Sequence, residues 1–127
     1  MIAKTALLCL SLNSYRETRG EEVAAQIAAM RVLMNRAELN HTTICKELAK
    51  PNQFSWVKKY KITYPNPHGQ IDKAAWIQAT QLASSVLSGD VIVKGISPKH
   101  VYFNTRNMGK RYKTKTKIKS IGKMLFY

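Results

Sequence analysis

Glu17 is the residue of this chain whose type and position best suit acid–base chemistry. Acidic residues are scarce, with seven Asp and Glu against 21 Lys and Arg. Glu17 follows an apolar stretch typical of a helix and precedes Gly20, where that helix should end. Burial at such a helix end can raise the pKa of a carboxyl group, so that the group can deliver a proton. Alternatively, Glu17 forms a surface ion pair with Arg16 or Arg19.

Helical patterns dominate the first two thirds of the chain and place Glu17 at the end of the first helix. Residues 23–34 include only Gln26 and Arg31 as polar residues, which predicts a helix buried nearly all round. Further helices are expected over residues 3–17 and 42–49 and from a cap at Asp72 to a stop at Gly89, and strands around residues 101–103, 117–121 and 124–127. The sequence therefore predicts an α+β fold, mainly helical with a small C-terminal antiparallel sheet, in one domain over residues 1–127.

A lysine-rich run near the C-terminus is the second feature with chemical meaning. Residues 91–127 hold 10 of the 21 basic residues and no Asp or Glu. Lys113, Lys115, Lys117 and Lys119 alternate with other residues, so a strand here would carry a row of lysines on one face. Such a face attracts polyanions, and salt should weaken the attraction. Nucleic acid, anionic cell-envelope polymers and a plain solvated edge strand all fit this pattern.

Composition narrows the class of protein. The chain has 127 residues, a formal net charge of +14 and 45% apolar residues, values that indicate a folded, very basic domain. No apolar run approaches the roughly 18 residues that a membrane helix needs. Cys9 and Cys45 stand 36 positions apart and the three histidines are scattered, so we expect neither a zinc site nor any cofactor. We expect the two thiols to be free, which fits a protein made in the reducing cytosol. Residues 1–12 suit an amphipathic helix better than a secretory signal, because no small-residue cleavage site follows.

Four segments, in the same order, resemble the SleB/CwlJ family of cell wall hydrolases. They are Tyr15-Arg-Glu-Thr-Arg-Gly-Glu21, similar to Tyr-x-Glu-Ala-Arg-Gly-Glu; Ala25-Gln-Ile-Ala-Ala-Met-Arg-Val-Leu-Met-Asn-Arg36, similar to a buried helix ending in Asn-Arg; Asn52-Gln-Phe-Ser-Trp56; and Ile121-Gly-Lys-Met-Leu-Phe-Tyr127, similar to Ile-Gly-x-x-x-Phe-Tyr. Together they span about residues 7–127. Thr18 stands in place of Ala, and Tyr112 stands where a Trp is often found.

The resemblance implies a lysozyme-like fold that acts on the glycan strands of peptidoglycan, with Glu17 as the catalytic residue. Members of this family are generally regarded as lytic transglycosylases, in which one Glu serves as acid and then as base. A hydrolase of the two-carboxylate kind would need a second acid roughly 5 to 9.5 Å away. Glu21 is the formal candidate, but Gly20 should break the helix between them. The scarcity of acidic residues fits the single-carboxylate mechanism better.

The same resemblance gives a purpose to residues 52–69, which read as a long ordered loop rich in aromatic, Pro and Asn residues. Trp56 offers a flat face to a sugar ring, and polar side chains offer hydrogen bonds to hydroxyl or N-acetyl groups. The predicted substrate-binding residues are Gln53, Ser55, Trp56, Tyr102 and Asn104.

These features together predict a muralytic enzyme, a peptidoglycan lytic transglycosylase or a muramidase-type glycosidase. We expect a monomeric bacteriophage endolysin that is made in the host cytoplasm and acts at the cell wall or periplasm. Its lysine face would hold it on anionic cell-envelope polymers. The alternative is a basic nucleic-acid-binding module that uses the lysine-rich C-terminal sheet, which leaves residues 15–21 and 53–56 without a purpose.

Overall fold

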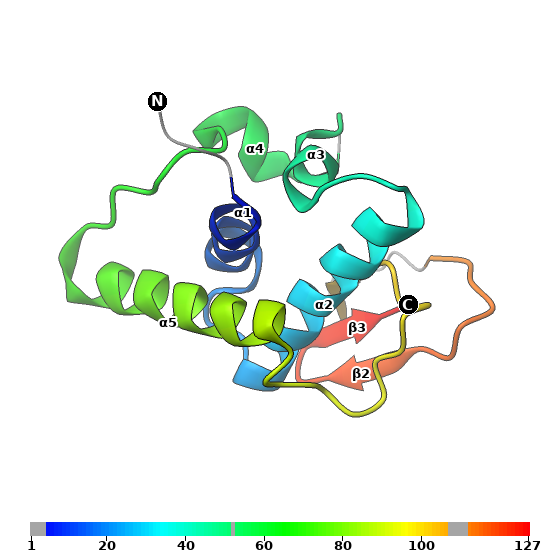
Figure 1. Ribbon diagram of the computed structural model, residues 1–127. Coiled ribbons are helices and arrows are strands. Elements are labelled where there is room, and N and C mark those ends of the chain that lie inside the picture. Colours follow the sequence, from blue (N-terminus) through cyan, green and yellow to red (C-terminus); the bar gives the residue numbers. More distant parts are fainter. Residues whose placement is uncertain (1–4, 52, 107–111) are drawn as a thin grey trace.

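A central helix with a helical layer on one side and a small sheet on the other organises the chain (Figure 1). The computed structural model describes residues 5–51, 53–106 and 112–127. The helices are α1 (Ala6–Asn13), a π-helix η1 (Ser14–Thr18), α2 (Val23–Leu39), α3 (Ile44–Ala49), α4 (Ser55–Tyr60) and α5 (Gly69–Ser88). The strands are β1 (Phe103–Thr105), β2 (Lys119–Ile121) and β3 (Met124–Phe126). This architecture confirms the predicted mainly helical α+β fold with a small antiparallel sheet.

The central helix α2 is buried on two sides, as its apolar sequence predicts. On one side Met30 and Leu33 join a core formed with α1, α3, α4 and α5. On the other side small residues of α2 let the sheet approach closely, and Phe126 packs there with no exposed surface. Both cores share α2, so the helical layer and the sheet hold each other in place.

The sheet places the last residues of the chain in its centre. Its order is β1-β3-β2, and both pairings are antiparallel, with Asn104 and Ser120 on either side of Leu125. Gly122 begins the two-residue turn between β2 and β3 with a φ of 56°, the conformation that favours glycine in such hairpins. A Cβ atom at this position would lie 3.2 Å from the side chain of Glu22, so the turn also rests on the start of α2.

Three local predictions were wrong. The expected loop over residues 52–69 contains α4, because Trp56 is buried against the helical core. Asp72 is not the cap of α5: His68 occupies that position, and Asp72 lies in the first turn, where its carboxylate accepts from the His68 N–H at 3.4 Å. The lysine row does not form a strand over residues 113–118, since β2 begins only at Lys119.

The two cysteines are also paired, contrary to the expectation of free thiols. A disulfide joins Cys9 in α1 to Cys45 in α3, with 5.4 Å between their Cα atoms. This geometry is within the normal range for a disulfide. Because disulfides persist mainly in oxidising compartments, the pairing fits a protein that works outside the cytoplasm.

Candidate functional site

The π-helix η1 positions Glu17. It continues α1 directly, and the chain leaves it through an extended Arg19 and then Gly20, whose φ is 89°. Thr18 fixes the turn by donating its hydroxyl to the Ser14 carbonyl oxygen at 3.1 Å. Single-turn π-helical segments are rare, and where they occur they are frequently at functional sites.

The carboxyl group of Glu17 is partly exposed and yet desolvated by the protein around it. This desolvation raises its pKa above the ordinary value of 4.5. The surface ion pair expected as an alternative does not form: Arg19 donates to Asp72 at 2.9 Å, and the Arg16 guanidinium stacks on the ring of Tyr60. Within the described residues, no hydrogen bond or ion pair engages the Glu17 carboxylate. It is therefore a carboxyl group suited to hold and release a proton.

Helix α5 anchors η1 from the side. Trp76 of α5 meets Tyr15 edge-to-face, with 5.6 Å between the ring centres. Asp72 lies one turn earlier on the same helix and binds Arg19. These two contacts flank Glu17 in the sequence, so they limit how far η1 can move.

Two of the predicted binding residues, Gln53 and Tyr102, are brought together by a residue that the sequence analysis did not assign. Arg36, at 5% exposure, donates from Nη1 to Gln53 Oε1 at 3.0 Å and from Nε to the Val101 carbonyl oxygen at 2.7 Å. Its guanidinium also lies 4.9 Å from the ring centre of Tyr102. Burial lowers the pKa of Arg36, but an arginine stays charged far above neutral pH. The available signal was the Asn-Arg pair near the end of a buried helix.

The remaining predicted residues occupy different environments. Trp56 is only 6% exposed and donates its indole N–H to Asn13 at 2.9 Å, so its ring offers no open face to a sugar. Asn104 is 7% exposed and accepts from the Tyr127 hydroxyl at 3.3 Å. Ser55 is exposed at the start of α4. Trp56 and Asn104 therefore support the site from within, contrary to the predicted sugar contacts.

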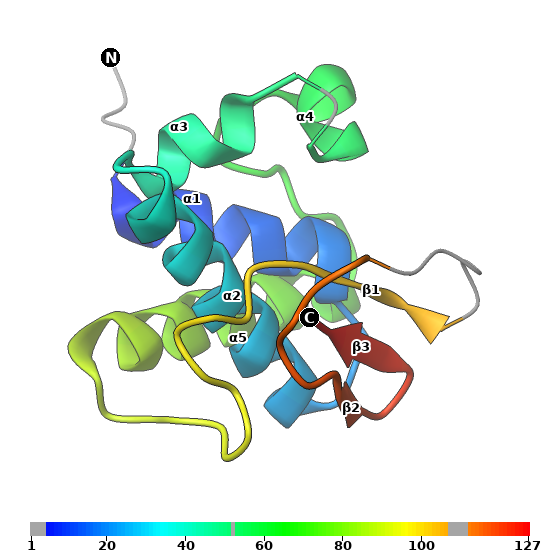
Figure 2. The same cartoon turned by 90° about the vertical axis from the view of Figure 1, so that its right-hand side faces the viewer.

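The elements that carry these residues lie toward one side of the molecule. Figure 2 shows the end of α1, the helix α4 and the strand β1 on that side. The bond between Trp56 and Asn13 joins α4 to the residue immediately before η1. The bonds of Arg36 join residues 53 and 101, next to α4 and β1. The elements that carry the predicted site residues are thus connected through buried and part-buried polar contacts.

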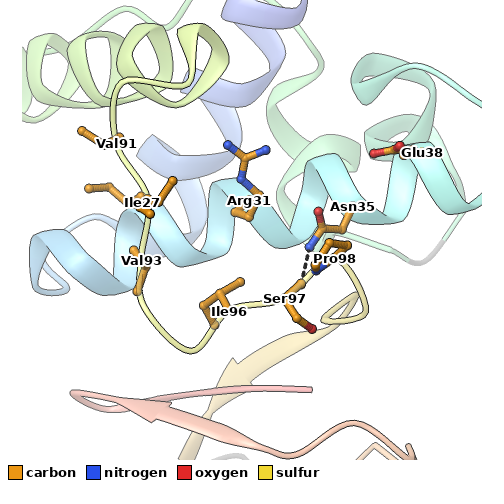
Figure 3. A pocket seen from close by; sticks show the side chains of 10 residues that line it. Ile27, Arg31, Asn35, Glu38, Val91, Val93, Ile96, Ser97 and Pro98 are labelled. Atoms are coloured by element: carbon orange, nitrogen blue, oxygen red, sulfur yellow. Dashed lines mark hydrogen bonds between the residues drawn. The ribbon is translucent and has the colours of Figure 1, made fainter.

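A cavity of about 330 Å³ lies elsewhere, between α2 and the segment that follows α5 (Figure 3). Its lining is mainly apolar, with Arg31 and Glu38 as the charged members. None of its lining residues comes from η1, α4 or β1. In the part of the chain that the structure describes, no cluster of His, Cys, Asp and Glu could hold a metal ion, and no helix has the length and apolar character of a membrane span.

A family model described as Cell Wall Hydrolase matches residues 20–127. The chain belongs to the cell wall hydrolase family. This result confirms the resemblance seen in the sequence and gives this cell wall hydrolase a peptidoglycan-degrading role at the wall. The match begins three residues after Glu17 and includes Gln53 and Tyr102. No curated protein and no solved structure matches the chain.

Proposed function

We propose that this cell wall hydrolase is a single-domain lytic transglycosylase that cleaves glycan strands between N-acetylmuramic acid and N-acetylglucosamine. The observation that carries the proposal is the state of Glu17, a carboxyl group without a partner among the described residues and with a raised pKa. Such a group can be protonated when the substrate binds and can donate that proton during bond cleavage.

In the proposed reaction, Glu17 acts first as an acid and then as a base. Its proton moves to the glycosidic oxygen while the bond from that oxygen to C1 of the muramoyl residue breaks and positive charge develops on the sugar ring. The 6-hydroxyl of the same sugar then attacks C1, and its proton returns to the Glu17 carboxylate. The products are a 1,6-anhydromuramoyl end and a free 4-hydroxyl on the other strand. No water is consumed, so no second carboxylate is needed.

Substrate contacts in this proposal come from residues beside α4 and β1. Gln53 and Tyr102 are held by Arg36, and Ser55 is exposed at the start of α4. Their amide, phenol and hydroxyl groups can bind sugar hydroxyl and N-acetyl groups.

The test is the mass of the soluble fragments released from purified peptidoglycan. We expect 1,6-anhydro ends, which are lighter by one water molecule than reducing ends. Reducing ends would show hydrolysis instead, and would direct attention to Glu21 as the residue that activates water. If no fragments are released across a range of pH and salt, the proposal is wrong.

The lysine-rich segment has a proposed role in holding the enzyme on its substrate. Lys113, Lys115 and Lys117 are exposed. His100 fixes the segment to the domain, because its ring Nε2 lies 2.8 Å from the Lys117 carbonyl oxygen and Nδ1 accepts from the Ser97 N–H at 3.0 Å. We propose that these lysines bind anionic cell-envelope polymers, a role that would suit a bacteriophage endolysin reaching the wall from the host cytoplasm.

Replacing Lys113, Lys115 and Lys117 by Gln should weaken binding to walls that carry anionic polymers by roughly tenfold at low salt and flatten its salt dependence. Co-sedimentation with walls at increasing salt measures both effects. The matched control replaces three exposed lysines from other parts of the chain by Gln: Lys46, Lys73 and Lys94. Equal losses in both triple variants would mean that net charge, and not this segment, is responsible.

A further inference from the structure

Arg16, next to Glu17 in η1, has no hydrogen-bond acceptor in the part of the chain that the structure describes. Its Nε atom is buried and unpaired. Its described contacts are with aromatic rings, 3.9 Å from the centre of Tyr60 and 5.2 Å from the centre of Tyr15. A guanidinium carries five N–H donors, and a buried donor of a charged group without an acceptor is costly. Nε is the atom of this guanidinium that is buried without a partner, so the Nη groups of the half-buried side chain are the donors that a ligand could reach.

The other arginines described by the structure differ from Arg16 in this respect. Each of them donates at least one hydrogen bond to a protein acceptor; the pairs are Arg19 to Asp72, Arg31 to Val86, Arg36 to Val101 and Gln53, and Arg106 to Ser120. Arg19 is the closest comparison, since it also stacks on Tyr15 and yet reaches a carboxylate. Arg16 also lies over the Tyr15 ring, but no carboxylate of the described residues binds it.

The position of Arg16 points to an anionic ligand beside the reacting bond. Arg16 and Glu17 belong to the same single-turn helix η1, so an anion bound by Arg16 would lie at the same end of α1 as the Glu17 carboxyl group. The Tyr60 ring, 3.9 Å from the Arg16 Cζ, supports the guanidinium, and a planar guanidinium can bind a carboxylate through its remaining N–H groups. Lys58, Lys59 and Lys61 surround Tyr60 in sequence and add positive charge to this end of α4.

We propose that Arg16 forms a subsite for the free carboxylates of the peptide stems on the glycan strand. The inference rests on the proposed function, because it places this ligand next to the bond that Glu17 would cleave. The N-acetylated sugars of the strand are themselves uncharged, and the lactyl group of muramic acid is used up in the amide bond to the peptide. The stems therefore supply the carboxylates. The motif Tyr-x-Glu-Ala-Arg-Gly-Glu does not specify the residue at position 16, so the proposal concerns the arginine of this chain.

The experiment compares three sets of glycan strands: with free stem carboxylates, with the same carboxylates amidated, and with the same carboxylates converted to methyl esters. For cleavage, kcat/KM of the wild type and of Arg16→Gln is measured on each set. We expect Arg16→Gln to lose about 10- to 100-fold on the free-carboxylate strands, the range for a hydrogen-bonded charged pair, and to stay within about twofold on the other two. Lys46→Gln, which removes an exposed charge from α3, should show no such selectivity.

Equilibrium binding to the same three sets keeps the test independent of catalysis. It is measured in a Glu17→Gln background with and without Arg16→Gln, and Arg16→Lys should restore only part of the affinity because a lysine lacks the planar fork. A selective loss of binding to free-carboxylate strands supports the subsite even if no strand is cleaved, in which case only the proposed function fails. An equal loss on all three sets would overturn the subsite and leave Arg16 as a structural partner of Tyr60. The subsite would also be overturned if Arg16→Gln weakened binding to anionic wall polymers more than binding to strands with free stem carboxylates.

Discussion

Replacing Glu17 by Gln should slow the release of glycan fragments by about 10²- to 10⁴-fold, the usual contribution of a general acid–base group. Gln nearly preserves the shape of the side chain and removes its proton. The Glu17 carboxylate has no described hydrogen-bond or ion-pair partner, so the exchange breaks no contact of the fold. Initial rates on purified peptidoglycan measure the effect, and circular dichroism verifies the fold.

The pH dependence gives this prediction a second readout. Because the acid form of Glu17 donates the proton, kcat/KM should fall as the pH rises through its pKa, which burial places above 4.5. The same shift acts on stability. A carboxyl whose pKa is raised by folding stabilises the protein below its unfolded pKa, and this contribution is lost as the pH rises through the folded value. Glu17→Gln should therefore be at least as stable as the wild type at neutral pH, with a difference that shrinks toward pH 4.

The matched control is Glu38→Gln, which removes an exposed carboxylate from the end of α2. It should change neither the rate nor its pH profile. A Glu17→Gln protein that keeps its fold and cleaves peptidoglycan within tenfold of the wild-type rate would remove Glu17 from the mechanism.

Removing the disulfide should cause the largest change in stability. The bond between Cys9 and Cys45 closes a loop with a sequence separation of 36 residues. The loss of its constraint on the unfolded chain corresponds to about 4 kcal/mol of the free energy of unfolding. For a domain of this size, that change lowers Tm by roughly 10 to 15 °C. Thermal unfolding of the wild type and of the double variant Cys9→Ala, Cys45→Ala measures the difference.

A reducing agent provides the internal comparison. It should lower the Tm of the wild type toward that of the double variant and leave the double variant unchanged. Since α1 runs directly into η1, the disulfide also fixes the segment that carries Glu17 to α3. A wild-type Tm that does not respond to complete reduction would contradict the assigned stabilising role.

The helical part of the fold was predictable because its signals are local. The apolar run of α2 and the stop at Gly89, which has a φ of 81°, both hold in the structure. Helix α4 was missed because its stability comes from Trp56 packing 43 positions away on Asn13. The alternating lysines wrongly predicted a strand, again because contacts with distant residues decide the local structure. His100 takes up the Lys117 carbonyl group, and the described part of the chain pairs β2 with β3 only from Lys119.

The candidate site was also only partly predictable from the sequence. Glu17 could be chosen from the sequence, because its motif and the scarcity of acids are both local. The π-helical turn that presents it could not be predicted, since the widened hydrogen-bonding pattern leaves no mark in residue spacing. The role of Arg36 depends on partners from two distant segments, residues 53 and 101, and no local pattern reports such a meeting.

The central place of β3 has a consequence for how the enzyme is made. Tyr127 is fully buried, and its backbone N–H donates to the Tyr102 carbonyl oxygen at 2.9 Å. The backbone of Tyr102 therefore gains this partner only after residue 127 has been synthesised. Glu17 is synthesised 110 residues earlier (127 minus 17), and at roughly 5 to 20 residues per second the interval lasts about 5 to 20 seconds. During translation the growing polypeptide therefore carries Glu17 before Tyr102 has this backbone partner, and we expect the proposed cleavage site to form only after residue 127 has been made.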